Sequence, residues 1–330
     1  MIDLCQVFPP KPGFKEQHLA DQAGRQPADI PKVFIVTGAT SGVGLELAKI
    51  LYQKNGTIYV AGRSESKIDA AIKTIQDQFP SGVGRLEHFL VDISDLSSVR
   101  SAAEKFLSRE TRLDILFHNA GVMFSSDDDR SAQGHELRMA TNCLGPHLLT
   151  HLLRPLLTRT ASSEADKKDL VRVVWVSSMI QLGTPKGGLI WDSQGQKPKL
   201  LGGMDQYMQT KAGAVFLAHE WGERLGIDGI VSVSLHPGLM KTELQRDIKL
   251  MQTMMGLLFK PAKFGAYTEL FAGFSPDVTV EKNGSFLLPW GRFGSIPDHI
   301  AVSMREESQG GSGLSKRFWE YCEDELSSFK

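Results

Sequence analysis

The stretch from Val33 to Leu51 reads VFIVTGATSGVGLELAKIL, and it joins an almost wholly apolar run to an amphipathic helical pattern. Three glycines, Gly38, Gly42 and Gly44, stand at the junction. Glycine permits the tight turn that such a junction requires and lets another molecule approach the backbone closely. The free N–H groups and positive dipole end of the following helix attract anions. The stretch therefore predicts a buried strand, a phosphate-binding glycine loop and a helix.

The same change from a short apolar run to a longer helical pattern recurs along the chain. The runs are TIYVAGR (57–63), LEHFLVD (86–92), LDILFHNAG (113–121), VRVVWVSS (171–178) and GIVSVSLHPG (229–238), and GSFLLPW (284–290) is a further candidate strand. Strands this apolar, separated by helix-length segments, are typical of a parallel sheet covered on both faces. The sequence therefore predicts an α/β fold with a doubly wound sheet of about seven parallel strands and helices on both faces.

No interior segment has the composition of a linker, so residues 31–330 are predicted to form a single domain. Residues 1–30 are polar and contain prolines, and we expect an N-terminal extension that packs loosely over that domain. SSDDDRS (Ser125–Ser131) and TASSEADKKDL (Thr160–Leu170) are charged and aperiodic, which is typical of surface loops. Neither loop requires a function.

Composition limits the classes of function. The chain has 330 residues, 41% hydrophobic and 23% charged, so it can bury a large core. Its net charge is −1 and its basic residues form no stripe, which argues against a nucleic-acid partner and favours a small molecule. Cys5, Cys143 and Cys322 are widely separated, which favours neither disulfides nor a metal site. With no signal-like start and no membrane-length apolar run, we expect a cytoplasmic protein without a transmembrane segment.

The glycine loop favours a dinucleotide. Its spacing is GxxxGxG rather than GxGxxG, but it falls at the first junction of a strand–helix series, where such a loop binds pyrophosphate. The second strand ends in Gly62 and Arg63, where an enzyme for NAD offers an acid. A guanidinium suits a 2′-phosphate, and Ser41 could add a hydroxyl donor. The pattern favours NADP(H) over NAD(H), although Arg63 could instead be a solvated loop residue.

A tyrosine and a lysine stand four residues apart in MDQYMQTKAG (Met204–Gly213). On a helix, Tyr207 and Lys211 leave the same face and can reach one ligand together. Such a pair also occurs on ordinary solvated helix faces, so the spacing alone does not decide between these alternatives.

Several motifs in one order resemble the short-chain dehydrogenase/reductase family. They are TGATSGVG (37–44), HNAG (118–121), Asn142 of NCLG, VSSM (176–179), YMQTK (207–211) and HPGLMKT (236–242). The stretch between Ser178 and Tyr207 and the segment PWGRFG resemble the retinol-dehydrogenase-like branch and fungal biosynthetic reductases. The resemblance implies a Rossmann-like fold and an NADP(H)-dependent oxidoreductase acting on CH–OH or C=O groups.

The resemblance also implies catalytic roles. Tyr207 would act as general acid or base, and the Lys211 ammonium would lower the tyrosine pKa and hold the nicotinamide ribose. Ser178, rather than Ser177, would donate to the substrate oxygen. Asn142 would hold a water of the proton relay, or it could merely satisfy a helix irregularity near Gly145.

The matching positions imply the cofactor contacts. They are Gly38, Ser41, Gly42, Val43, Gly44, Arg63, Asp92, Ile93, Asn119, Ala120, Gly121, Tyr207, Lys211, Pro237, Gly238 and Thr242. Asp92 would contact adenine, and Asn119 is expected to be partly structural. His118 and His236 are interpreted as strand-end residues, and no metal site is expected.

The substrate is less well defined. An apolar stripe of leucines, methionines and Phe259 lies in residues 243–265, and it could cover the substrate, form a core helix or contact a membrane surface. We expect reduction of an apolar ketone or aldehyde, such as a secondary metabolite, with oxidation of an alcohol as the alternative and a silent nucleotide-binding scaffold as a weaker one. The helix segment VFLAHEWGERL (215–225) could pair two copies of the chain or be buried in the core.

Overall fold

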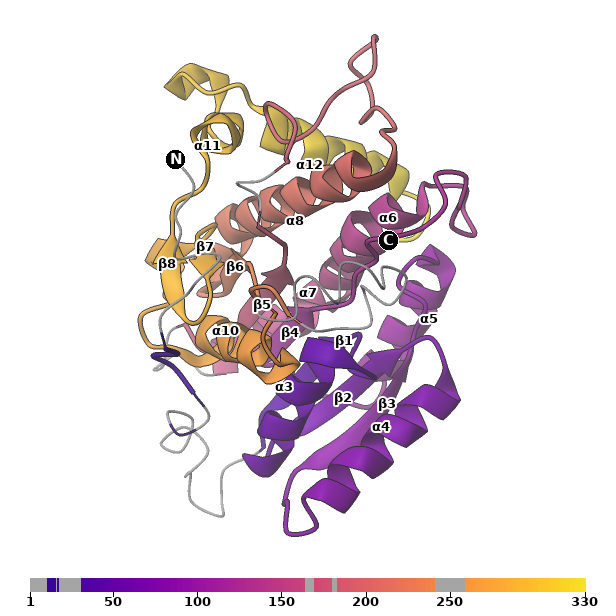
Figure 1. Ribbon diagram of the computed structural model, residues 1–330, viewed down its shortest axis with the longest axis vertical. Coiled ribbons are helices and arrows are strands. Elements are labelled where there is room, and N and C mark those ends of the chain that lie inside the picture. The colour runs from indigo at the N-terminus through magenta and orange to yellow at the C-terminus, as the bar shows by residue number, and fades with distance from the viewer. Residues whose placement is uncertain (1–10, 16, 18–30, 164–168, 180–182, 241–258) are drawn as a thin grey trace.

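The computed structural model describes residues 11–15, 17, 31–163, 169–179, 183–240 and 259–330. Within them, one sheet of eight strands has the order β3-β2-β1-β4-β5-β6-β7-β8, and its colours run from indigo at β1 to orange at β7 and β8 in Figure 1. The strands are β1 (Val33–Thr37), β2 (Thr57–Gly62), β3 (Arg85–Leu90), β4 (Ile115–His118), β5 (Arg172–Val176), β6 (Val231–Leu235), β7 (Phe286–Leu288) and β8 (Arg292–Gly294). All the predicted apolar runs form strands.

Helices connect the strands and cover the sheet. They are α3 (Gly42–Gln53), α4 (Glu65–Gln78), α5 (Leu96–Leu107), the short α6 (Leu137–Met139), a π-helix at Ala140–Leu144, α7 (Gly145–Ser163), α8 (Gly203–Leu225), α10 (Ala262–Phe274), α11 (Asp298–Met304) and α12 (Leu314–Glu325). Helices α3 and α4 follow directly on β1 and β2, as the alternating pattern predicts.

Two hydrophobic cores lie on opposite faces of the sheet. One face packs against α3, α4 and α10, through residues such as Leu47, Ile68 and Leu270. The other face packs against α5, α7, α8 and α12, through residues such as Phe216 and Trp319. A sheet with helices on both faces is the doubly wound architecture that the sequence predicts. The central strands β1, β4 and β6 are buried on both sides because each side faces a core, whereas the edge strand β3 is partly exposed.

One edge of the sheet differs from the prediction. Seven strands, β1 to β7, pair in parallel, whereas β8 runs antiparallel to β7 with Phe286 opposite Gly294. The predicted seven parallel strands are therefore present, and an eighth strand closes a hairpin at the edge. Strand β8 is three residues long and only partly buried. It carries no apolar run, so only its pairing with β7 defines it as a strand.

Most of the predicted N-terminal extension lies outside the described residues. Within its described part, Phe14 is buried and packs edge-on against Phe271 of α10, with 5.9 Å between the ring centroids. This segment therefore contributes an aromatic side chain to the α10 face of the domain.

Helix α12 covers the outer face of α8. Trp319 of α12 packs edge-on against Trp221 of α8 at 4.9 Å between ring centroids, and Phe318 lies against Gly213. The apolar residues of 215–225 are thus buried within the chain, which is the second of the two alternatives considered for that segment. No helix in the described part of the chain is long and apolar enough to cross a membrane.

Candidate active site

A cavity of about 470 Å³ opens at the carboxyl ends of the parallel strands. It lies where the strand order reverses between β1 and β4, the place at which doubly wound sheets bind their ligands. The predicted site residues that line it are Gly38, Ser41, Gly42, Val43, Arg63, Asp92, Ile93, Asn119, Ala120, Gly121, Ser178, Tyr207, Lys211, Pro237 and Gly238. Gly44 and Asn142 stand just behind this wall, and Thr242 lies outside the described residues.

The glycine loop between β1 and α3 forms one end of the cavity. Gly38 and Gly42 have φ values of +68° and +57°, in the left-handed region that favours glycine. A Cβ on Gly38 would lie 3.0 Å from the Ala120 Cα, and one on Gly44 would lie 2.8 Å from the Gly38 carbonyl oxygen. Ser41 is the N-cap residue of α3, and its side chain makes no capping hydrogen bond. The loop therefore offers backbone N–H groups and a hydroxyl to an anion, which fits a pyrophosphate.

Asn119 ties two strand ends together beside this loop. Its Nδ2 donates to the Thr37 carbonyl at 2.8 Å and more weakly to the Gly38 carbonyl at 3.4 Å. Thr37 in turn accepts from the Ala120 N–H at 2.9 Å and donates to the Phe117 carbonyl at 3.1 Å. Asn119 thus fixes the glycine loop against the segment that follows β4, in agreement with the structural part of its predicted role.

Basic side chains line the cavity near the end of β2. Arg63 is exposed there, beside Ser64 and Lys67. Lys67 lies in the first turn of α4, four residues after Arg63 in the sequence, and it was not among the predicted cofactor contacts. The N-terminus of a helix is an unfavourable place for a cation, because it is the positive end of the helix dipole. A lysine at that position is therefore the sequence signal that could have identified Lys67 as a candidate ligand-binding residue.

The loop after β3 forms the adjacent wall. The Asp92 carboxylate accepts hydrogen bonds from the Ser94 N–H at 2.9 Å and from the Ser94 hydroxyl at 2.7 Å, and this fixes its orientation. Ile93 is buried beside it. The carboxylate and the apolar side chain together fit a polar aromatic ring such as adenine.

Tyr207, Lys211 and Ser178 meet at the opposite end of the cavity. Tyr207 and Lys211 lie in the first turns of α8 and are 7% and 5% exposed, so the alternative of a solvated helix face is wrong. Lys211 Nζ lies 5.6 Å from the Tyr207 ring centroid and donates to the Val176 carbonyl at 2.9 Å. The Ser178 side chain is hydrogen-bonded to Tyr207, whereas the Ser177 hydroxyl donates to the Lys211 carbonyl at 2.7 Å.

Burial shifts the pKa values of Tyr207 and Lys211. It raises the pKa of Tyr207 above 10.0, while the hydrogen bond with Ser178 acts in the opposite direction. Burial also lowers the pKa of Lys211 to about 8. The sequence predicted that Lys211 would lower the pKa of Tyr207, but this pKa is raised. In the polypeptide alone, the cost of removing the phenolate from water is the larger effect. Tyr207 is therefore a neutral phenol, which is a proton donor.

Asn142 lies in the π-helix just behind the cavity. Its Oδ1 accepts from the Val122 N–H at 2.9 Å, and its Nδ2 donates to the Val122 carbonyl at 3.0 Å and to the Thr210 hydroxyl at 2.9 Å. A Cβ on Gly121 would lie 3.2 Å from both Asn142 Oδ1 and Lys211 Nζ, so the glycine leaves space between them. Asn142 thus lies in a helix irregularity, which is one of the two alternatives considered for it, and its role in a proton relay stays a prediction.

The two histidines at strand ends are uncharged. Burial lowers the pKa of His118 and of His236 to about 3. His118 Nε2 lies 2.7 Å from the Thr150 hydroxyl, while His236 follows β6 and lines the cavity. Within the described ranges, no group of three or more His, Cys, Asp or Glu residues could hold a metal ion.

Apolar side chains that the sequence analysis did not identify line the cavity beside Tyr207. They are Val122, Met123, Phe124, Leu137, Met179, Leu239 and Met240. They come from separate segments, so no local periodicity marks them as one wall. The methionine-rich stripe expected to cover the substrate lies outside the described residues, except for Phe259.

Known proteins are similar to this chain over most of its length. The chain matches the family model for short chain dehydrogenases over residues 32–189. It is 42% identical over 331 residues to a short-chain dehydrogenase/reductase of Phomopsis amygdali, covering 98% of this chain and 96% of that protein. It is 40% identical to the short-chain dehydrogenase/reductase bet4 of Neocamarosporium betae, covering 98% and 92%. A solved structure of an uncharacterized protein from Mycobacterium paratuberculosis is similar with a TM-score of 0.61 at 26% identity, covering 91% and 96%.

The extent of these matches shows the family. Its members are oxidoreductases that bind NAD(P)(H) and act on CH–OH or C=O groups of small molecules. The resemblance found in the sequence motifs, including that to fungal biosynthetic members, is confirmed. The fold, the glycine loop and the matches together lead to one conclusion: this chain belongs to the short-chain dehydrogenase/reductase family.

Proposed function

We propose that this protein reduces the carbonyl group of an apolar small molecule with NADPH, using Tyr207 as the general acid. The observation that carries the proposal is the buried Tyr207, hydrogen-bonded to Ser178 and one helical turn from Lys211, beside an apolar wall. When bound, NADPH supplies the hydride. The protein supplies the proton, the position of the substrate oxygen and the exclusion of water.

Each side chain has a distinct task in this proposal. The Ser178 hydroxyl donates to the substrate oxygen and holds it near the Tyr207 phenol, which passes its proton to the oxygen as negative charge develops. Lys211 supports the charge of the phenolate that remains, and a neighbouring water restores the proton. Asn142 keeps the Val122 segment in place beside them.

Two basic side chains support a preference for NADPH. Arg63 and Lys67 line the cavity at the end of β2, where a ribose 2′-phosphate would lie in this fold. No acid stands at the end of β2 to hold a free 2′-hydroxyl, since Gly62 and Arg63 occupy that position. We therefore propose Gly38, Ser41, Gly42, Arg63, Lys67 and Asp92 as cofactor contacts, with Thr242 as a further contact from the family pattern.

The neutral phenol of Tyr207 is the form that carbonyl reduction requires. A neutral phenol is ready to give a proton, whereas alcohol oxidation requires a phenolate to take one. Oxidation of an alcohol with NADP⁺ is the second candidate, because the same residues serve both directions. The apolar side chains of Met123, Phe124 and Met179 line the cavity and favour an apolar substrate in either direction.

Replacing Tyr207 by Phe tests the catalytic assignment. We expect kcat for carbonyl reduction to fall by a factor of about 10² to 10⁴, which is the usual contribution of a positioned acid. The affinity for NADPH, measured by fluorescence titration, should change little. A panel of apolar and hydrophilic carbonyl compounds would be assayed with NADPH and with NADH.

Tyr52→Phe is the matched control, because Tyr52 is also 7% exposed but lies in α3 and does not line the cavity. Its activity should equal that of the wild type. Turnover retained in Tyr207→Phe would contradict the catalytic assignment. Turnover of hydrophilic carbonyls alone would contradict the apolar substrate.

A further inference from the structure

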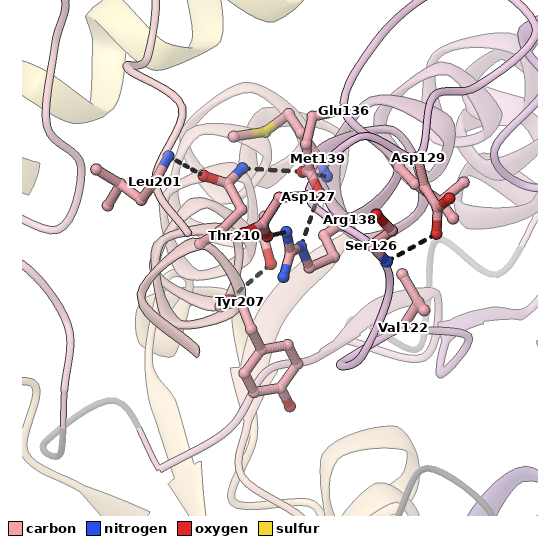
Figure 2. Close-up of polar contacts among 12 residues, drawn as sticks. Val122, Ser126, Asp127, Asp129, Glu136, Arg138, Met139, Leu201, Tyr207 and Thr210 are labelled. Carbon is pink, nitrogen blue, oxygen red and sulfur yellow. Dashed lines mark hydrogen bonds and ion pairs between the residues drawn. The ribbon is translucent and has the colours of Figure 1, made fainter. Parts of the chain in front are cut away.

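The segment between β4 and α6 runs past the cavity without regular structure. It lines the cavity from Asn119 to Phe124 and then forms the loop 125–131, which is exposed over residues 126–130. Asn142 holds the cavity end of this segment through both backbone groups of Val122. The far end is held by a separate cluster around Arg138, which Figure 2 shows in contact with Asp127 and Glu136. The segment is thus fastened at two points.

Arg138 is a buried cation with two carboxylate partners. Its side chain is 1% exposed, and its guanidinium pairs with Asp127 at 2.6 Å and with Glu136 at 2.7 Å. The same guanidinium donates from Nη1 to the Gly203 carbonyl at 2.8 Å. Gly203 is the first residue of α8, the helix that carries Tyr207 one turn later. Arg138 therefore contacts both the loop and the catalytic helix.

Asp127 acts on the same residue of α8 from the loop side. Its Oδ1 accepts from the Gly203 N–H at 3.0 Å as well as from Arg138. The N-cap of α8 is Gly202, which has no side chain, so α8 lacks a cap of its own. A carboxylate at a helix N-terminus satisfies a free N–H group and favours the positive end of the dipole. Asp127 therefore supplies from a distant loop the cap that the helix sequence does not contain.

Glu136 makes a second link to α8. Its Oε2 accepts from the N–H of Met139, the last residue of α6, at 2.8 Å and from Gln206 Nε2 at 2.9 Å. Gln206 immediately precedes Tyr207 and is fully buried. In Figure 2 the Tyr207 ring extends away from this cluster, so the cluster holds the backbone of the helix and leaves the phenol free.

We propose that Asp127, Arg138 and Glu136 form a positioning cluster that fastens the cavity-lining segment after β4 to the first turn of α8, and so sets the substrate wall relative to Tyr207. The inference rests on the proposed function for its effect on turnover. The cluster does not touch the reacting atoms. It holds Met123 and Phe124 on one side and Tyr207 on the other at a fixed separation, and small displacements there are costly because the acid must meet the substrate oxygen within hydrogen-bonding distance.

Asp127→Ala is the test variant, because it removes the oxygen that accepts from Gly203 and Arg138, while Asp127 is 58% exposed and Arg138 keeps its buried partner Glu136. Asp128→Ala is the matched control: it makes the same change one residue away, and within the described residues the Asp128 carboxylate has no hydrogen bond or ion pair. Three quantities are compared in the full-length protein. They are amide hydrogen exchange in residues 202–206, kcat/KM for the carbonyl substrate and the dissociation constant for NADPH.

We expect Asp127→Ala to speed exchange in residues 202–206 by about fivefold or more and to lower kcat/KM for the carbonyl substrate about tenfold. The NADPH dissociation constant should stay within about twofold, because the glycine loop and Arg63 lie apart from the cluster. Asp128→Ala should match the wild type in all three. Equal exchange in the two variants would overturn the proposal, and so would a loss of NADPH affinity as large as the loss of kcat/KM. The exchange comparison remains decisive even if the wild type reduces none of the carbonyl compounds.

Discussion

At the scale of single residues, two neighbouring serines after β5 take opposite tasks. The Ser177 hydroxyl donates to the Lys211 carbonyl, and Ser178 is bonded to Tyr207 at the cavity. Both serines line the cavity, but their hydroxyls bind different partners. Ser177 fixes the backbone of α8 at Lys211. Ser177 thus positions α8, while the adjacent Ser178 contacts the proposed proton donor.

Arg63 allows a prediction at this scale. In Arg63→Gln the KM for NADPH should rise about tenfold, since a hydrogen bond to a charged group contributes about 1.5–3 kcal/mol and this residue is exposed. The KM for NADH should not change, because NADH has no 2′-phosphate, and NADH therefore serves as the internal control. Steady-state kinetics with both cofactors measures the effect. Equal rises in both KM values, or a wild type that prefers NADH, would contradict the assignment.

At the scale of elements, the π-helix at Ala140–Leu144 brings Asn142 to the cavity wall. The next residue, Gly145, begins α7 and packs directly against the Ile93 backbone. A Cβ at Gly145 would overlap the Ile93 carbonyl oxygen and would lie 2.8 Å from its Cγ2 atom. This close approach joins the α7 end of the π-helix to the loop that holds Asp92. The glycine is therefore required by packing between two elements, rather than by its own dihedral angles.

Gly145→Ala should consequently disturb both sides of that contact. We expect a loss of about 1–3 kcal/mol in the free energy of unfolding, the usual cost of overpacking, together with weaker NADPH binding because Ile93 lines the cavity. Urea denaturation and fluorescence titration measure the two effects. Gly13→Ala is the control, since a Cβ there meets nothing within 4 Å. Wild-type stability in Gly145→Ala would show that the loop yields without cost.

At the scale of the whole molecule, helix α12 is fastened onto the domain by a buried histidine. His147 of α7 is fully buried, and its Nε2 lies 2.7 Å from Glu323 Oε1 on α12. The Trp221 indole N–H of α8 donates to His147 Nδ1 at 2.9 Å, so Nε2 carries the hydrogen that Glu323 accepts. Burial alone would raise the pKa of Glu323, but the hydrogen bonds from His147 and Lys330 outweigh it and hold the pKa at about 2. Three helices thus meet at one polar contact at the edge of an apolar core, where His147 is buried and Glu323 is partly exposed.

Glu323→Gln should lower the free energy of unfolding at pH 7 by about 1–3 kcal/mol, because it removes the charge that His147 and Lys330 face. The folded pKa of Glu323 lies below its ordinary value of 4.5, so its stabilising effect is present above that value. The difference between wild type and variant should therefore shrink as the pH falls from about 4.5 toward 2. Denaturation curves at several pH values measure it. Glu320→Gln, an exposed change on the same helix, is the control, and an equal loss there would contradict this account.

Much of the fold and part of the site follow from the sequence, because the features that specify them are local. The apolar runs and the glycine loop predicted the parallel strands and the cavity end at Gly38, since strand burial and tight turns are encoded within a few residues. The four-residue spacing of Tyr207 and Lys211 predicted that they share a face, because helical periodicity alone determines this.

Only the tertiary structure decided the rest. The β8 hairpin, the π-helix and the apolar wall have no local pattern, since each exists through packing against a partner element. The loop SSDDDRS gave no sign that Asp127 would reach Gly203, which is 76 residues away along the chain. A cap supplied from that distance depends on how β4, α6 and α8 pack together. The sequence by itself therefore determined which groups carry the chemistry, and the packing of distant elements decided what holds them in position.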